Sequence, residues 1–324
     1  MRFRITVTII TAVIIGLLPG LTSTATGLTV GDVVSQVSQT TYRNYLDNTL
    51  YTHLGDDRGF GPQHDLARDN ISSQFNGFGL DTSLQPFSYS GSTYSNVVGV
   101  HTGTTRPQDV YILGAHFDSV SNPGADDNAS GTSGVLEAAR VLSQYSFEAT
   151  LIFIAFDREE QGLFGSKAYA QAHSTDNILG MISLDMIAYN PNGSNQARIY
   201  GRDTSASIKG ELAEAISLYG NGLSSVDSGT LNASDHAPFE DLSFPACLLI
   251  EYNVWSNPYY HKSTDSVDTP DYIDYAFATN MVSSTVGFLA DNAVLIPEPA
   301  TLLLLALGSV ILRGKHRPNP SELS

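Results

Sequence analysis

The segment TLIFIAF, from Thr150 to Phe156, is a continuous apolar run without the alternation of a half-exposed strand. A strand of this kind is covered on both faces, as in a parallel sheet between two layers of helices. Further apolar runs lie at residues 110–115, 178–187 and 246–252, and segments with helical spacing separate them. Strands that alternate with helices predict an α/β fold, here a three-layer sandwich with a mixed, largely parallel central sheet flanked by helices.

Weaker signals complete this prediction. Short apolar runs and apolar spacing predict elements at 96–101 (strand), 131–145 (helix), 165–173 (helix), 197–200 (strand) and 205–219 (helix). A last helix is predicted to begin at Thr269-Pro270-Asp271, where a capping residue precedes a proline and an acidic residue. The segment from Gly27 to about Tyr89 is more polar and helical and is expected to pack against the sheet.

Imidazole and carboxylate groups follow the apolar runs. In chain order they are His116, Asp118, Asp127, Glu159, Glu160, Asp185 and His261. Ligand sites in open α/β sheets lie beyond the carboxyl ends of the strands, so we expect these groups to share one edge. Imidazole and carboxylate together suit zinc and similar divalent ions. These seven groups include more ligands than one tetrahedral zinc can take, and five ligands are the right number for two metals that share a bridging carboxylate.

Five motifs carry a resemblance to a known family. They are GAHFDSVSNPGADDNASG, FDREEQGLFGS, SLDMIAY, SDHAPF and YYHKSTD, in this order. Together they resemble the M28 co-catalytic zinc aminopeptidases, above all the secreted bacterial type, over about Asn96 to Ala290. The resemblance implies two Zn²⁺ per chain and the hydrolysis of N-terminal residues from peptides or proteins.

The resemblance also implies a role for each residue. One zinc would be held by His116 and Asp185, the other by Glu160 and His261, with Asp127 as the bridge between them. The catalytic roles fall to Glu159 as general base and acid, and to Tyr260, which would help polarise the substrate carbonyl. Asp118 would accept the imidazole N–H of His116. A cis peptide bond is expected directly after Asp127.

Several other residues are interpreted as structural. Asp126 is expected to be a structural loop acid, His236 a structural or supporting residue, and Cys247 a small buried hydrophobe. The remaining histidines are expected to lie at the surface or to bond locally; they are His53, His64, His101 and His173. For the aromatic cluster two roles remain open, lining an apolar pocket or packing within loops; its members are Tyr252, Trp255, Tyr259 and Tyr260.

Two departures from the family pattern concern substrate preference. With one cysteine the chain forms no internal disulfide, whereas some secreted relatives brace the loop of the last histidine ligand with one. Leu231-Asn232-Ala233 stands where some relatives have an arginine before the SDHAPF-like motif.

Both ends of the chain resemble targeting signals. Residues 1–26 have two arginines and then a short apolar run, as in a secretory signal peptide, with a membrane anchor as the alternative. Residues 27–295 are then a single catalytic domain. Residues 296–324 resemble a PEP-CTERM sorting tail, with Pro297-Glu298-Pro299, a short apolar transmembrane segment and basic residues. This predicts export, transient inner-membrane association, removal of the tail by a sorting peptidase, and release to the cell envelope or extracellular matrix.

The formal net charge of −17 argues against a nucleic-acid partner. Two alternatives to an aminopeptidase remain. One is another enzyme on the same scaffold, a carboxypeptidase or a glutaminyl cyclase. The other is a non-catalytic envelope binding protein, whose signature would be a lost ligand or a lost Glu159, and neither is lost.

Overall fold

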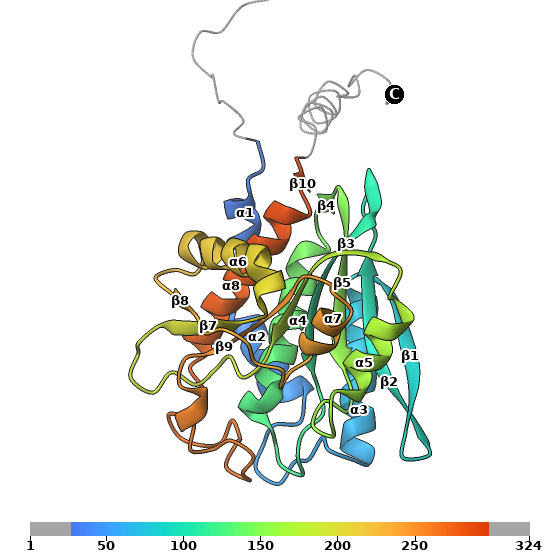
Figure 1. Ribbon diagram of the computed structural model, residues 1–324. Helices are drawn as coiled ribbons and strands as arrows, with labels where there is room; N and C mark the ends of the chain where they lie inside the picture. The colour runs from blue at the N-terminus through green and yellow to red at the C-terminus, as the bar shows by residue number, and fades with distance from the viewer. Residues whose placement is uncertain (1–26, 298–324) are drawn as a thin grey trace, which may run out of the picture. The chain divides into compact units, whose positions relative to one another are not determined.

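An eight-stranded mixed sheet forms the centre of the described region, residues 27–297 of the computed structural model (Figure 1). In spatial order its strands are β1 (Asp81–Tyr89), β2 (Ser92–His101), β5 (Ala149–Phe156), β3 (Arg106–His116), β6 (Asn177–Leu184), β9 (Ala246–Glu251), β7 (Gln196–Tyr200) and β8 (Ser224–Asp227). The four strands β5, β3, β6 and β9 run parallel to one another. Outside them the β1–β2, β2–β5 and β7–β9 pairs are antiparallel and the β7–β8 pair is parallel. The predicted mixed, largely parallel sheet is confirmed.

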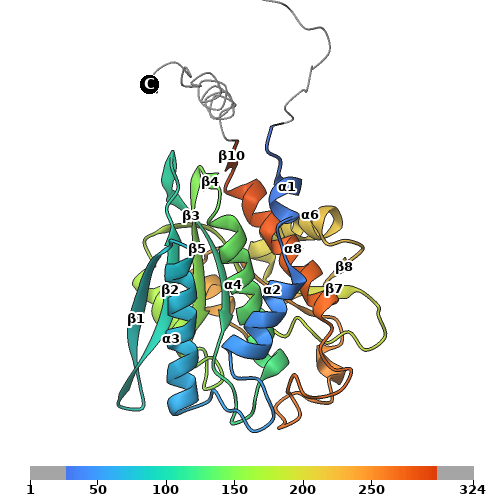
Figure 2. The same cartoon turned by 180° about the vertical axis from the view of Figure 1, so that it is seen from behind.

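Helices cover both faces of the sheet. One face carries α1 (Val30–Val34), α2 (Gln39–Asn44), α3 (Pro62–Gly77), α4 (Gly131–Leu142), α6 (Ala206–Tyr219) and α8 (Tyr275–Asn292), and Figure 2 shows most of them in front of the strands. The other face carries α5 (Phe164–Ala172) and α7 (Ala237–Asp241). Each face of the sheet packs into its own apolar cluster. The three-layer prediction is therefore confirmed.

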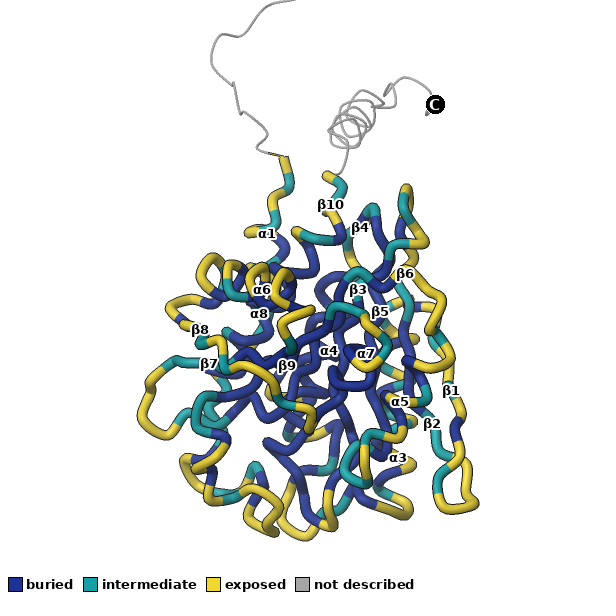
Figure 3. Tube along the Cα trace, viewed as in Figure 1, coloured by how far each residue is buried: buried dark blue, intermediate teal, exposed yellow. Residues whose placement is uncertain are grey.

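Burial follows the sequence pattern closely. Every residue of β5 is buried, as its continuous apolar run predicts. Figure 3 shows the central strands and α4 as buried, with exposed segments at the outer loops. A separate two-stranded sheet joins β4 (Ser146–Phe147) to β10 (Leu295–Ile296).

The last helix begins later than the sequence predicted. The structure starts α8 at Tyr275, with Asp274 as the capping residue, and the prediction of a start at 269–271 is wrong. Asp271 has a left-handed φ of 56°, which no helix accommodates, and the backbone N–H of Asp274 bonds to Ala188. The side chain of Asp274 accepts a hydrogen bond from the backbone of Phe277, so it caps the helix instead.

No helix among residues 27–297 is long and apolar enough to cross a membrane. The predicted signal peptide and the apolar part of the predicted sorting tail lie outside the described residues.

Candidate metal centre

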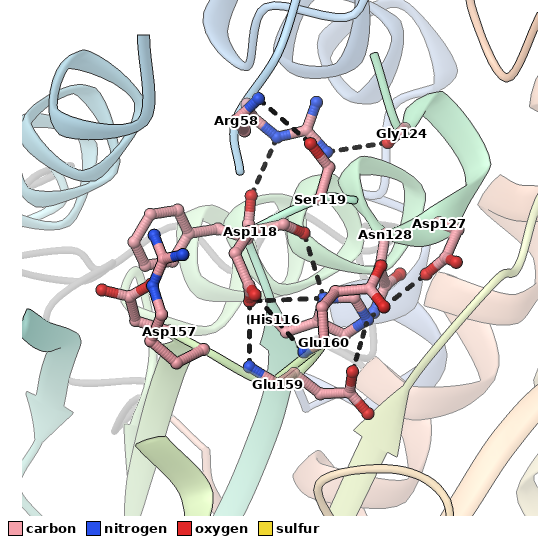
Figure 4. A network of polar contacts seen from close by, with 12 residues as sticks. Arg58, His116, Asp118, Ser119, Gly124, Asp127, Asn128, Asp157, Glu159 and Glu160 are labelled. Atoms are coloured by element: carbon pink, nitrogen blue, oxygen red, sulfur yellow. Dashed lines mark hydrogen bonds and ion pairs between the residues drawn. The ribbon is translucent and has the colours of Figure 1, made fainter. Parts of the chain in front are cut away.

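The predicted metal ligands gather at the carboxyl ends of the parallel strands. Figure 4 shows His116, Asp127 and Glu160 among them, with Glu159 beside them. β3 ends at His116, and the turn after β5 carries Glu159 and Glu160. Asp185 directly follows β6, and His261 lies on the loop that follows β9. Parallel strands end at one edge of a sheet, so side chains far apart in the sequence meet there.

Asp127 faces two histidines, each with a different oxygen. Its Oδ1 lies 3.4 Å from Nε2 of His116, and its Oδ2 lies 3.1 Å from Nε2 of His261. Asp185 Oδ1 is 3.7 Å from His116 Nε2, and Glu160 Oε2 is 3.3 Å from His261 Nε2. Within each of these two groups of three the ligand atoms lie within 4.8 Å of one another. The geometry is that of one carboxylate shared between two adjoining sites.

Hydrogen bonds hold the backbone of the bridging segment. The carboxylate of Asp265 accepts the backbone N–H groups of Asp126, at 2.7 Å, and of Asp127, at 3.1 Å. The side chain of Asn128 donates to Leu184 O and accepts the backbone N–H of Gly131, which starts α4. The peptide bond between Asp127 and Asn128 is cis, as the resemblance implies.

The carboxylate of Asp118 holds the glutamate turn. It accepts the backbone N–H groups of Glu159 and Glu160, at 3.1 and 3.3 Å. The imidazole of His116 makes its shorter contact elsewhere: Nδ1 lies 3.1 Å from the backbone oxygen of Asp118 and 3.6 Å from its carboxylate. The imidazole therefore bonds to the backbone oxygen of Asp118 instead of the expected carboxylate, and the carboxylate holds the backbone of both glutamates.

Burial and mutual repulsion dominate the electrostatics of the site. Burial, together with the charge of Asp127, raises the pKa of Glu160 to about 7. Burial also raises the pKa of Glu159 well above its ordinary value, against the opposing charge of His116. Hydrogen bonds to Asp127 and Glu160 raise the pKa of His261 to about 10. In the absence of a compensating cation, Glu159 and Glu160 therefore keep their protons to a higher pH than free carboxyl groups do.

This donor set fits divalent cations. The set comprises two imidazoles and three carboxylates. Both kinds of group bind zinc in sites where one position stays open to water. Glu160 Oε1 is buried and has no hydrogen-bond partner among residues 27–297, so one oxygen of a proposed ligand remains available. Residues His116, Asp127 and Asp185 would hold one ion, and Asp127, Glu160 and His261 the other.

Two supporting residues, Ser234 and Asp265, lie within the motifs SDHAPF and YYHKSTD, but the sequence analysis gave them no role. Ser234 donates a hydrogen bond of 2.7 Å from its hydroxyl to Asp185 Oδ2, and Asp265 holds the bridging segment as described above. Asp235, which is buried, adds a negative charge that raises the pKa of Glu159. The sequence contains Ser234 and Asp235 within SDHAPF, but the residue types alone did not indicate which atoms they contact.

The structure tests several of the structural assignments. Asp126 is buried and accepts hydrogen bonds from Ala188 and Asn257, and Cys247 is buried in the core. His236 bonds to the backbone oxygen of Leu231. These three agree with structural roles.

His64 differs from its prediction. It is buried, and its Nε2 lies 2.8 Å from the carboxylate of Asp157, which is 93 residues further along the chain. The expectation of a surface or locally bonded histidine is wrong, because α3 packs against the end of β5.

A cavity of about 200 Å³ lies beside the site residues. Its ionisable polar lining comes mainly from His116, Asp127, Glu159, Glu160 and Asp185. Its apolar lining comes mainly from Met186, Leu231, Leu248, Ile250, Val254 and Trp255. No lysine or arginine of the described residues lines it.

The aromatic cluster divides between the two roles left open by the sequence. Trp255 and Tyr260 line the cavity, and the ring of Tyr260 stacks on His261 with 3.8 Å between centroids. Tyr259 packs against Tyr272, and Tyr252 lies under the guanidinium of Arg198.

Comparisons with known proteins agree with this fold. Aminopeptidase YwaD of Bacillus subtilis is 30% identical over 205 residues, which are 58% of this chain and 43% of that protein. LapB of Legionella pneumophila superposes with a TM-score of 0.73 at 22% identity, over 82% of this chain and 75% of that one. A glutaminyl cyclase of Bacteroides thetaiotaomicron superposes with a TM-score of 0.67 at 19% identity, over 78% and 97%. At these two identities the likeness shows the fold alone.

The sequence matches cover only part of the relatives. Among four curated relatives, the matched share of their own length runs from 22% to 45%. The family model described as Peptidase family M28, in contrast, matches residues 96–286 of the 324, a span that includes all five candidate ligands. The chain therefore belongs to peptidase family M28.

Proposed function

We propose that the chain is an exported dinuclear zinc aminopeptidase. The observation that carries the proposal is the placement of Asp127, whose two carboxylate oxygens face His116 and His261 separately. Each histidine has a second carboxylate beside it, so two ions would share one bridge. The similarity to Aminopeptidase YwaD of Bacillus subtilis supports the reaction class.

In this proposal Glu159 is the proton carrier. Bound zinc would lower the pKa of a water molecule and polarise the substrate carbonyl. Glu159 is not needed in either group of ligands, lines the cavity, and has a raised pKa because it is buried. A carboxylate of this kind accepts a proton from the attacking water and returns it to the leaving amine. Tyr260, which also lines the cavity, would donate a hydrogen bond to the carbonyl oxygen.

The charge of the cavity favours an aminopeptidase over a carboxypeptidase. The free amino end of a peptide is a cation, and four carboxylates line the cavity. A carboxypeptidase must bind the carboxylate end of its substrate, for which arginine is the usual partner. Neither arginine nor lysine lines the cavity within the described residues.

The deciding experiment compares substrates on the purified 27–295 segment loaded with zinc. Aminoacyl anilides should be cleaved, and the same anilides with an acetylated amine should not. Release of a C-terminal residue from N-blocked peptides would instead support the carboxypeptidase. Conversion of an N-terminal glutamine to pyroglutamate would support the cyclase, and zinc binding without any turnover would support the binding protein.

The apolar lining predicts a preference for large apolar N-terminal residues. We expect kcat/KM to be at least about 10-fold higher for leucine than for glutamate or lysine substrates. Trp255 is 68% exposed at the cavity and donates to Tyr200 OH, so its ring can cover a bound side chain. Trp255→Ala should lower the leucine-to-alanine ratio of kcat/KM about 10-fold. Leu218→Ala, which removes an equally exposed apolar residue on α6, should leave the ratio unchanged.

We also propose export and removal of the tail. The order of Pro297-Glu298-Pro299, an apolar segment and basic residues motivates this part. The protein recovered from its native envelope should have a mass that lacks residues 300–324. A recovered mass that retains the apolar segment, 302–312, would count against removal of the tail by a sorting peptidase.

A further inference from the structure

Arg58 is fully buried, and within the part of the chain that the structure describes its guanidinium bonds only to backbone oxygens. Nε donates to Phe117 O at 2.8 Å, and Nη2 donates to Gly124 O at 2.7 Å. Nη1 donates to Tyr51 O at 3.1 Å and also to Pro123 O. Among the described residues Arg58 forms no ion pair. The role of this buried arginine is therefore to hold four backbone carbonyl groups in place.

Three of the four oxygens that Arg58 contacts, those of Phe117, Pro123 and Gly124, lie at the two ends of one loop. Phe117 directly follows His116, and Gly124 lies three residues before Asp127. The backbone N–H of Arg58 also donates to Ser119 Oγ, whose hydroxyl in turn donates to Asn122 O (Figure 4). One residue from the N-terminal segment thus joins both ends of the loop between two proposed metal ligands.

The packing around Gly124 shows how closely this contact is fitted. Gly124 has a φ of 55°, in the left-handed region that favours glycine. A Cβ atom there would lie 2.4 Å from the backbone oxygen of Asp127 and 3.0 Å from Nη2 of Arg58. The turn therefore lies between the guanidinium and the bridging aspartate, with no space for a side chain. The five N–H donors of a planar guanidinium point in fixed directions toward these carbonyl oxygens. The three N–H donors of a lysine ammonium cannot point toward all of them.

We propose that Arg58 is a positioning residue whose guanidinium holds the 117–124 loop so that His116 and Asp127 are preorganised for metal binding. This inference rests on the metal centre of the proposed function. If the loop were not held, metal binding would have to order it, and the conformational entropy lost would weaken the affinity.

The test compares Arg58→Met and Arg58→Lys with the wild type. Zinc affinity, measured by competition with a chelator, should fall about 10-fold in Arg58→Met, the lower end of the range for residues that support metal ligands. The zinc affinity of Arg58→Lys should lie between that of the wild type and that of Arg58→Met. Saturating zinc should restore most of kcat with little change in KM, since Arg58 does not line the cavity. In the metal-free protein, hydrogen exchange of the amides in residues 117–127 should become faster.

A stability control separates positioning from general destabilisation. Phe75→Leu changes a fully buried residue on α3, so it should lower the unfolding temperature without lowering zinc affinity. The inference would be overturned if Arg58→Lys kept the zinc affinity and the exchange rates of the wild type. It would also be overturned if Phe75→Leu lost as much zinc affinity as Arg58→Met. If the wild type bound no zinc, the proposed function would fail, while the exchange experiment would still decide the role of Arg58.

Discussion

Replacing Glu159 by alanine is expected to lower kcat by about 10²–10⁴-fold, the usual contribution of a general base, while both zinc ions stay bound. The reason is that Glu159 belongs to neither group of candidate ligands, although its Oε2 lies only 3.9 Å from Nε2 of His116. KM should change little, because the lost interaction acts in the transition state. Glu159→Gln, which keeps the shape of the side chain, should show the same loss of kcat.

The neighbouring Glu160 is the matched control. Its Oε2 lies beside Nε2 of His261, and both residues belong with Asp127 to one group of candidate ligands. Glu160→Ala should therefore lose one zinc and, with it, activity. Excess zinc should partly rescue Glu160→Ala and should not rescue Glu159→Ala. Elemental analysis and steady-state kinetics on both variants provide the measurement. Loss of metal from Glu159→Ala with full metal in Glu160→Ala would mean that the two roles are reversed.

The sequence predicted the centre of the fold better than its borders. Strands with continuous apolar runs, such as β5 and β9, are covered on both faces, and their burial depends on their own residues. β1 was not predicted, because it is an edge strand with mostly exposed or half-exposed residues and contains Pro86. Proline is tolerated on an edge, where no neighbouring strand requires its missing N–H.

The candidate site was predictable where its residues stand beside the strand ends. His116, Glu160 and Asp185 lie at the ends of apolar runs, so topology alone predicts that they meet. The division of the ligands between two ions came from the family resemblance. The distances around Asp127 provide an independent reason for it.

The supporting contacts could not be predicted in the same way. Arg58 bonds to the oxygen of Gly124, 66 residues away, and Asp265 bonds to the N–H of Asp127, 138 residues away. Backbone groups are present at every position, so such partners leave no residue type by which to recognise them. These contacts became visible only once the packing of the N-terminal segment and the 262–266 turn against the ligand loop was known.

Removal of zinc by a chelator is expected to abolish activity and to lower the unfolding temperature. At a zinc concentration about 1,000 times the Kd, bound metal stabilises the folded state by about 4 kcal/mol relative to the metal-free protein. Without the metal, Asp127, Glu160 and Asp185 are left close together and largely buried. The loss should be reversed by added zinc.

The difference in unfolding temperature between the zinc-loaded and the metal-free protein should depend on pH, and this dependence gives the sharper test. In the metal-free protein the pKa of Glu160 is raised from 4.5 to about 7, and that of His261 from 6.5 to about 10. Through these two groups the metal-free folded state binds more protons than the unfolded state between about pH 4.5 and 10, so their contribution to its stability falls as the pH rises through that range. Bound zinc displaces these protons, so the zinc-loaded protein does not lose this stability as the pH rises. The gap in unfolding temperature between loaded and metal-free protein should widen from pH 5 to pH 8, as scanning calorimetry can measure. A gap that stays constant or narrows would show that Glu160 and His261 do not hold the metal.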